Sequence, residues 1–208
     1  MDDTVVVITG LLTPFYVENL IAQYKYTKHK IVSIWNDQDI YLIFKLTISG
    51  FQIVCNKYPE LRSSANLQII CAHNGVERAI ANGFKYICHA RTDIFPLNFN
   101  KFLTATRHIY TEGLMVPCGI DNGLMYYVQL LITGPAEEMR KLYSKLEAND
   151  TKFPEKFLIE NYAGRPIDTR EDVLSVFRTF LDICKKENIE FLWARPPEWF
   201  IGERSNPL

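Results

Sequence analysis

The sequence has little of what marks a disulfide-rich, zinc-binding or nucleic-acid-binding protein. Its five cysteines are an odd number, they are widely spaced, and none forms a Cys-x-x-Cys pair. This pattern indicates reduced thiols in a cytosol-like compartment and argues against a zinc site. The 23 basic and 24 acidic side chains nearly cancel, leaving a formal net charge of −1. We therefore expect no basic surface for nucleic acid.

The patterns of a signal peptide and of a membrane span are also missing. The chain opens with Met-Asp-Asp, which is acidic where a signal peptide is basic. The uncharged stretch Thr4–Val17 is broken by Gly10 and Pro14, and the stretch Asn122–Ala136 is short for a span. We expect no transmembrane segment and a cytoplasmic location, with peripheral attachment to a membrane left open.

Sequence motifs of several common enzyme classes are absent. There is no GxGxxG dinucleotide-binding loop, no P-loop and no GxSxG nucleophile motif. We also find no repeat, no low-complexity tract and no linker between domains. What remains is 208 residues with 48% hydrophobic and 23% charged side chains. These values are typical of one globular domain with a sizeable core.

The first half of the chain alternates short apolar runs with helical patterns. Such alternation implies parallel strands joined by right-handed crossovers, and so an α/β fold with a mostly parallel, Rossmann-like sheet flanked by helices. In these sheets ligands bind at the carboxyl ends of the strands. The loops expected there are 10–13, 36–38, 56–59 and 91–93. We predict strands at Thr4–Thr9, Lys30–Trp35, Phe51–Cys55 and Phe84–Ala90, with helices at Phe15–Lys25, Asp39–Ile48 and Asn66–Asn82.

The second half is less regular. Its apolar runs predict strands, and its amphipathic or capped segments predict helices. The expected strands are Leu114–Pro117, Met125–Thr133 and Glu190–Trp193, and the expected helices are Glu137–Leu146, Pro154–Tyr162 and Glu171–Lys186.

The segment His89–Asp93 is the most informative for function, because it follows the fourth predicted strand directly. A carboxylate at this edge, Asp93, is suited to binding a divalent cation that neutralises a leaving diphosphate. Arg91 would add a planar phosphate contact. The alternative is a surface Arg–Asp pair at a strand end, and His89 is read as a core residue. Asn36 and Asp37 could bind a base or ribose, or could cap the next helix.

Three acidic residues in the second half are candidates for a general base acting on an acceptor hydroxyl. They are Glu155, Glu160 and Asp121, and the alternative reading of each is ordinary surface charge.

These segments resemble those of a known enzyme class. The helix-to-strand segment GVERAIANGFKYI followed by Arg91-Thr92-Asp93 resembles the first half of GT-A-type glycosyltransferases, which carry a DxD-like motif after the fourth strand. Over residues 60–160 the chain resembles the WavE lipopolysaccharide-synthesis family more closely. The elements that match in order are Asn66, Gln68, Gly75, Arg91-Thr92-Asp93, YYVQLLITGPAEEMRKLY and PEKFL at Pro154–Leu158.

The chain departs from the family pattern at two positions. Gln129 stands where an acidic residue is expected. Arg91 replaces the first Asp of the DxD motif, so the resemblance implies a metal site with one carboxylate, Asp93.

The resemblance implies a single GT-A-like domain over residues 1–208, with a nucleotide-sugar-binding half at 1–95 and an acceptor half at 96–208. It implies transfer of a sugar from a nucleoside-diphosphate donor to a glycan, lipid-linked or protein hydroxyl acceptor in surface polysaccharide, lipopolysaccharide or glycoprotein glycan synthesis, aided by Mn²⁺ or Mg²⁺ on Asp93. Glu155 is the expected base. The expected donor-binding residues are Thr9, Gly10, Asn36, Asp37, Asn66, Gln68, Arg91 and Asp93.

Two other functions stay open at this point. One is a noncatalytic nucleotide- or sugar-binding domain, which Gln129 favours because it lacks the expected acid. The other is a scaffold part of a larger glycan-synthesis protein.

Overall fold

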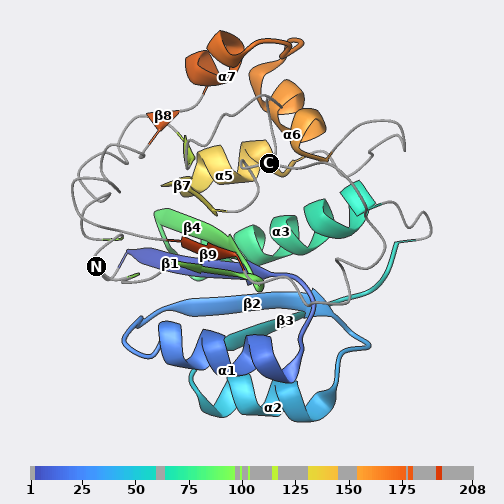
Figure 1. Ribbon diagram of the computed structural model, residues 1–208, viewed down its shortest axis with the longest axis vertical. Helices are drawn as coiled ribbons and strands as arrows, with labels where there is room; N and C mark the ends of the chain where they lie inside the picture. The colour runs from blue at the N-terminus through green and yellow to red at the C-terminus, as the bar shows by residue number, and fades with distance from the viewer. Residues whose placement is uncertain are drawn as a thin grey trace.

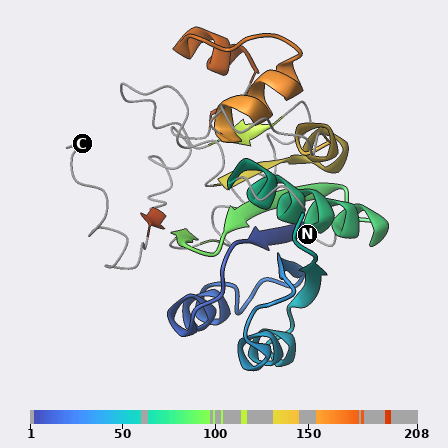
Figure 2. The same cartoon turned by 90° about the vertical axis from the view of Figure 1, so that its right-hand side faces the viewer.

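In the computed structural model, the described residues are 3–59, 64–96, 99, 103, 114–116, 131–144, 154–176, 178–179 and 191–193. They form a seven-stranded sheet in the order β3-β2-β1-β4-β7-β6-β8, with helices on both faces (Figures 1 and 2). The predicted α/β class with a mostly parallel sheet is confirmed.

The first half folds as the alternation predicts. Strand β1 pairs in parallel with β2 and β4, and β2 pairs in parallel with β3. Because these four strands run the same way, their carboxyl ends meet at one edge of the sheet. The elements are β1 (Thr4–Thr9), α1 (Pro14–Gln23), β2 (Lys30–Trp35), α2 (Ile40–Ile48), β3 (Gln52–Asn56), α3 (Ser64–Ala81) and β4 (Tyr86–Arg91).

The second half extends the sheet with a reversal of direction. Strand β7 is antiparallel to β4, and β5 pairs with β9 in a separate two-stranded sheet. The elements are β5 (Ile94–Pro96), β6 (Met115–Val116), β7 (Leu131–Pro135), α5 (Ala136–Leu142), α6 (Pro154–Ala163), α7 (Arg170–Val176), β8 (Arg178–Thr179) and β9 (Phe191–Trp193).

The predicted helix Glu171–Lys186 is wrong at its centre. Helix α7 ends at Val176, and Arg178–Thr179 forms strand β8, which pairs in parallel with β6. Local sequence favours a helix here, but the backbone groups of this segment bond to a neighbouring strand instead. The predicted helix Glu137–Leu146 also stops early, at Leu142.

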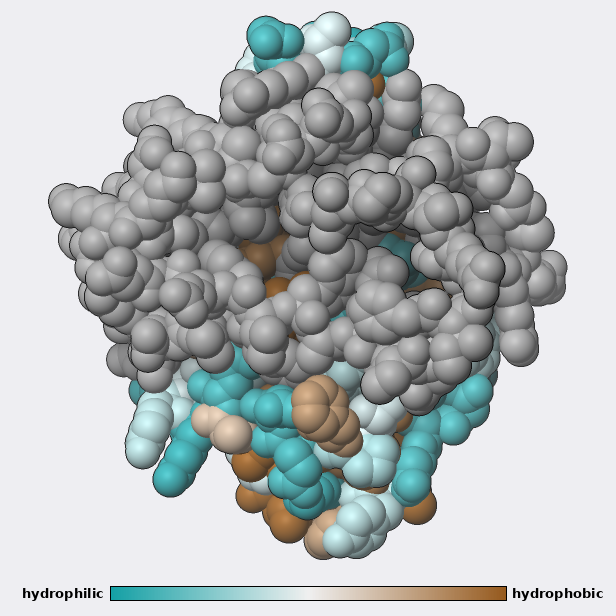
Figure 3. Space-filling model, viewed as in Figure 1, coloured by the Kyte–Doolittle hydropathy of each residue, from teal (hydrophilic) through white to brown (hydrophobic). Residues whose placement is uncertain are grey.

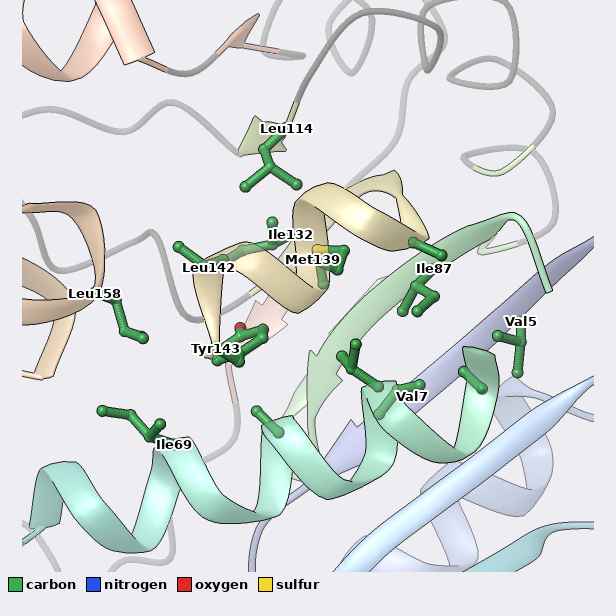
Figure 4. Packing of buried hydrophobic residues seen from close by; sticks show 14 of the residues in the cluster. Val5, Val7, Ile69, Ile87, Leu114, Ile132, Met139, Leu142, Tyr143 and Leu158 are labelled. Carbon is green, nitrogen blue, oxygen red and sulfur yellow. The ribbon is translucent and has the colours of Figure 1, made fainter. Parts of the chain in front are cut away.

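Two hydrophobic clusters hold the helices to the sheet. Val5 and Val7 of β1 face the α3 side, while Val6 and Ile8 face α1 and α2. Strands buried on both faces read as continuous apolar runs, which is the pattern that located β1 in the sequence. Figure 4 shows the first cluster, where residues of α5 and α6 meet those of α3 and the sheet.

Helix α3 lies unusually close to the sheet at Gly75. A Cβ atom at this position would lie 2.5 Å from Cγ1 of Val7 and 3.1 Å from Cβ of Ser33. Glycine is therefore needed here for close packing of the helix on the sheet.

Candidate functional site

The structure brings most of the predicted donor-binding residues to the carboxyl edge of the sheet. Strands β1, β2 and β4 end at Thr9, Trp35 and Arg91, so Gly10, Asn36 and Thr92-Asp93 come next at the same edge (Figure 1). This is the edge where open α/β sheets bind ligands.

Gly10 allows the loops after β1 and β4 to touch. The backbone N–H of Thr92 donates a hydrogen bond to the carbonyl oxygen of Thr9 at 2.9 Å. Gly10 has a φ of 140°, and a Cβ atom there would lie 2.3 Å from Oγ1 of Thr92. Both the backbone conformation and the contact exclude a side chain.

Asp37 organises the loop after β2. Its Oδ1 accepts a hydrogen bond from the hydroxyl of Tyr58 at 3.0 Å and one from Nε2 of Gln38 at 3.2 Å. Oε1 of Gln38 in turn accepts a hydrogen bond from the backbone N–H of Leu12 at 2.8 Å. The loops after β1 and β2 are therefore tied together. Tyr58 also stacks on Trp35, with ring centroids 4.5 Å apart.

Gln68 belongs to the same edge, although it lies on a helix. It precedes Gly75 by seven residues, so both lie on the sheet-facing side of α3. Seven helical residues span about 10 Å, roughly the length of three strand residues. Counting from Val7 and Ser33, which contact Gly75, this places Gln68 level with Gly10 and Asn36.

The side-chain carbonyl oxygen of Gln68 is buried and has no hydrogen-bond partner among the described residues. A buried acceptor without a partner is costly, so a bound molecule with a donor group would be favoured here. Asn66 lies in the first turn of α3, and its side chain is outside the described residues.

Arg91 and Asp93 form a two-pronged ion pair. Nε of Arg91 donates to Oδ1 of Asp93 at 2.9 Å, and Nη2 donates to Oδ2 at 2.7 Å. The side chains are 24% and 10% exposed. The sequence left an Arg–Asp pair at the surface as an alternative; the pair forms, but Asp93 is buried.

The described residues do not fit a divalent-cation site. Both carboxylate oxygens of Asp93 already bind Arg91. Across the described ranges, no group of three or more His, Cys, Asp or Glu side chains is placed to hold a metal ion. The assignment of Mn²⁺ or Mg²⁺ to Asp93 stays a prediction.

His89 lies one step inside the edge and is buried in the sheet. Its Nε2 lies 2.9 Å from the hydroxyl of Thr9, and its Nδ1 lies 2.9 Å from the hydroxyl of Tyr143. Burial, and then the charge of Arg91, lowers the pKa of His89 to about 3. The imidazole is therefore neutral, with one nitrogen donating and the other accepting.

Two polar residues that support the site were missed in the sequence. Tyr143 follows α5, far along the chain from His89, and nothing local signals their contact. Asn56 ends β3 and is buried: its Nδ2 donates to Oγ of Ser33 at 2.9 Å, and its Oδ1 accepts from Asn74 at 2.7 Å. For Asn56, the sequence did offer one signal of this role, because an Asn directly follows a predicted buried strand.

Of the three candidate bases, only Glu160 has a side chain among the described residues. Glu155 is in the first turn of α6, and its side chain is outside the described residues, as are Asp121 and Gln129. Oε1 of Glu160 accepts a hydrogen bond from the backbone N–H of Ile167 at 3.3 Å. This contact ties α6 to the following loop.

Cys55, Cys71 and Cys88 are free thiols. Within the part of the chain that the structure describes, no helix is long and apolar enough to cross a bilayer.

Comparison with known proteins identifies the fold. No protein-family model and no curated protein matches the chain, so the resemblance to the WavE family stays a prediction. Among solved structures, a Bacillus anthracis protein assigned as a glucose-1-phosphate thymidylyltransferase, determined with sucrose, matches with a TM-score of 0.52 and 9% identity, covering 85% of each chain. HddC from Yersinia pseudotuberculosis matches with a TM-score of 0.51 and 13% identity, covering 95% of this chain and 96% of its own.

At these identities the likeness shows the fold alone. The chain has a GT-A-like α/β fold with a mostly parallel sheet flanked by helices, as the sequence predicted.

Proposed function

We propose that this chain is a glycosyltransferase that binds a nucleoside-diphosphate sugar at the carboxyl edge of β1, β2 and β4 and transfers the sugar to a hydroxyl acceptor. The observation that carries the proposal is the buried carbonyl oxygen of Gln68, which has no partner among the described residues. It lies level with Gly10 and Asn36, on the edge where α/β sheets bind nucleotides.

The nucleoside is assigned to the loops after β1 and β2. Asn36 and Asp37 are exposed polar residues there, and they match the donors and acceptors of a base and a ribose. Thr9 and Gly10 lie at the end of β1 beside this loop, where Gly10 lets the loop after β4 pack against them. Gln68 would accept a hydrogen bond from a donor group of the nucleotide.

The diphosphate is assigned to Arg91. Its Nε and Nη2 are held by Asp93, and its Nη1 makes no hydrogen bond with another described residue. Asp93 therefore orients the guanidinium, and Nη1 is available for a phosphate oxygen. A cation on Asp93 would require the carboxylate to release Arg91, so no step here is assigned to a metal.

The acceptor base is assigned to Glu155. In the proposed reaction the acceptor oxygen bonds to the anomeric carbon, and the bond from that carbon to the diphosphate oxygen breaks. Glu155 takes the hydroxyl proton. Its place in the first turn of α6 favours the ionised carboxylate, because the helix N-terminus carries partial positive charge.

A thermal-shift panel of nucleoside diphosphates tests the donor site. At about 100 times its dissociation constant, the correct nucleotide should add roughly 2.7 kcal/mol to the free energy of unfolding. Gln68→Leu should weaken binding by about tenfold without lowering the melting temperature of the free protein, because it removes an acceptor that lacks a partner. Gln52→Leu, the same change at the amino edge of the sheet, is the control.

Two outcomes would contradict or narrow the proposal. If no nucleoside diphosphate shifts the melting temperature at millimolar concentration, the donor site is wrong. If a nucleotide sugar binds but no acceptor leads to its turnover, a noncatalytic binding role explains the site better than a transferase activity.

A further inference from the structure

Three buried polar side chains from distant parts of the chain form one line of hydrogen bonds that ends at the carboxyl edge of the sheet. The hydroxyl of Thr9, at the end of β1, lies 2.9 Å from Nε2 of His89, and Nδ1 of His89 lies 2.9 Å from the hydroxyl of Tyr143. Thr9, His89 and Tyr143 are 6%, 3% and 1% exposed. At such burial each hydrogen of the line needs an acceptor, because a buried polar group without a partner is costly.

Tyr143 is fixed at the inner end of this line. It follows α5 and packs between α5 and α3 (Figure 4). Nδ1 of His73, on α3, donates a hydrogen bond to the carbonyl oxygen of Tyr143 at 3.1 Å. The ring of Tyr143 meets the ring of His89 edge to face, with the centroids 5.3 Å apart. The phenol hydroxyl is therefore held against Nδ1 of His89.

The hydroxyl of Tyr143 has to donate along this line. Burial raises the pKa of Tyr143 above its ordinary value, so the hydroxyl keeps its hydrogen. Among the described residues, Nδ1 of His89 is the one partner within hydrogen-bond distance of that hydroxyl. If Nδ1 carried a hydrogen, the hydrogen of Tyr143 would be buried without an acceptor. The unprotonated nitrogen of His89 is therefore Nδ1.

The direction of that bond decides what the hydroxyl of Thr9 can do. A neutral imidazole has one N–H, so Nε2 of His89 carries the hydrogen and donates it to Oγ1 of Thr9. The hydroxyl of Thr9 then keeps its own hydrogen for a different acceptor, and no such acceptor is found among the residues that the structure describes. Thr9 therefore offers a hydrogen-bond donor at the carboxyl end of β1.

The side chain of Thr9 lies in the same layer as the oxygen of Gln68. Side chains alternate along β1, so Thr9 is on the side of Val5 and Val7, which pack against α3. Gln68 is on the sheet-facing side of that helix, level with Gly10, and its buried oxygen has no partner among the described residues. One donor and one acceptor, both uncharged, are thus available at neighbouring levels. They suit a neutral group that accepts and donates, such as a ribose hydroxyl or the edge of a base.

The described surface beside this pair is polar. Asn36 and Asp37 are exposed in the loop after β2. Figure 3 shows hydrophilic side chains on the right of the molecule, where this loop leaves the sheet in Figure 1. These surroundings are those of a polar ligand rather than an apolar one.

We propose that Tyr143 and His89 are positioning residues of the nucleotide site: they hold the hydroxyl of Thr9 as a hydrogen-bond donor to a neutral group of the nucleoside, and Gln68 accepts from the same group. The inference rests on the proposed function, because it states how that site recognises its ligand. Tyr143 and His89 do not touch the nucleotide, and both act through Thr9.

A double-mutant cycle, measured by isothermal titration calorimetry, tests whether Tyr143 acts through Thr9. Thr9→Val should lower the affinity for a nucleoside diphosphate about two- to tenfold, the range for one neutral hydrogen bond. Thr9→Ser, which keeps the hydroxyl, should restore most of that affinity. Tyr143→Phe should lower the affinity to a similar extent in the original chain and should have no further effect in Thr9→Val.

The matched control for Tyr143→Phe is Tyr162→Phe. It removes a phenol hydroxyl that donates to Glu138, outside the line of hydrogen bonds, and should leave the affinity unchanged. Equal losses from Tyr143→Phe in the original chain and in Thr9→Val would overturn the proposal, because Tyr143 would then act independently of Thr9.

The tautomer of His89 is measured in the ligand-free protein. Nitrogen chemical shifts from NMR distinguish a protonated ring nitrogen from an unprotonated one, and loss of the signals in His89→Gln assigns them. We expect the hydrogen on Nε2 in the original chain and in Tyr162→Phe, and a mixture of tautomers or a hydrogen on Nδ1 in Tyr143→Phe. A hydrogen on Nδ1 in the original chain would overturn the proposal.

The remaining outcomes separate the source of the neutral group from failure of the site. If the group is a ribose hydroxyl, Thr9→Val should weaken binding of the ribonucleotide and not of the deoxy counterpart that lacks this hydroxyl. If the group is a base edge, Thr9→Val should weaken binding of both, and either result supports the proposal. Equal affinity of Thr9→Val and the original chain would overturn this inference alone. If the original chain binds no nucleoside diphosphate, the proposed function and this inference fail together.

Discussion

The guanidinium of Arg91 binds both carboxylate oxygens of Asp93, at 2.9 and 2.7 Å. This contact bears on whether Asp93 is a metal ligand or a residue that positions Arg91. When both oxygens of a carboxylate accept hydrogen bonds from one arginine, the main effect of the carboxylate is to orient that guanidinium. In the proposed donor site, Arg91 is therefore the group that would contact the diphosphate, and Asp93 is its positioning residue.

Replacing Arg91 should weaken nucleotide binding. Arg91→Lys keeps the charge and loses the planar fork that Asp93 orients. We expect a loss of about 10- to 100-fold in nucleoside-diphosphate affinity, the range for one hydrogen bond to a charged group. Isothermal titration calorimetry measures it, and Arg78→Lys, exposed on α3 away from this edge, is the control. Equal affinity in Arg91→Lys would remove Arg91 from the site.

Asp93→Asn separates a positioning role from metal binding. If Asp93 acts by orienting Arg91, the variant should bind nucleotide more weakly both in EDTA and in Mn²⁺. Calorimetry under the two conditions gives the answer. If Mn²⁺ strengthens binding in the original chain and no longer does so in Asp93→Asn, the single-carboxylate metal site implied by the WavE resemblance is supported instead.

His89 should make the protein acid-sensitive. Its pKa is lowered to about 3 in the folded chain, below the unfolded value of about 6.5. The unfolded chain therefore takes up the proton first, and stability is lost as the pH falls from about 6.5 toward 3. The slope should be at most about 1.4 kcal/mol per pH unit.

Urea unfolding at pH 6.0 and pH 4.5 checks this expectation. Carboxylates also titrate in this range, so the comparison is with His89→Gln, which should show a shallower slope than the original chain. Parallel slopes would mean that His89 is not buried as a neutral imidazole.

Gly75→Ala should destabilise the fold. The new Cβ would lie 2.5 Å from Cγ1 of Val7, which is inside van der Waals contact. Overpacking of this kind costs about 1–3 kcal/mol. Chemical denaturation measures the change in unfolding free energy. An unchanged value would show that α3 can move away from the sheet without cost.

Glu155→Gln tests the proposed base. Turnover should fall by about 10²- to 10⁴-fold while nucleotide affinity stays the same. Glu160→Gln in the same helix should keep its turnover, and its amide oxygen can still accept from the backbone N–H of Ile167. If turnover survives in Glu155→Gln, the carboxylate serves only the helix N-terminus, and Asp121 is the next residue to test.

Local pattern was sufficient for the first half of the fold. The apolar run Thr4–Thr9 and its helical neighbours predicted parallel strands, because strands buried on both faces are apolar at every position. The same alternation placed Gly10, Asn36 and Arg91 at one edge, since parallel strands end together. Local pattern was wrong at Arg178–Thr179 in the second half, where a strand paired with β6 replaces part of the predicted helix.

The sequence by itself determined the class of fold and which loops share the carboxyl edge of the sheet, because both follow from periodicity and strand direction. Tertiary structure alone decided what individual side chains do there. Contacts between residues distant in the chain joined Tyr143 to His89, and the packing of α3 left the oxygen of Gln68 buried without a partner among the described residues. Such contacts depend on how helices pack on the sheet, and no local pattern encodes that geometry.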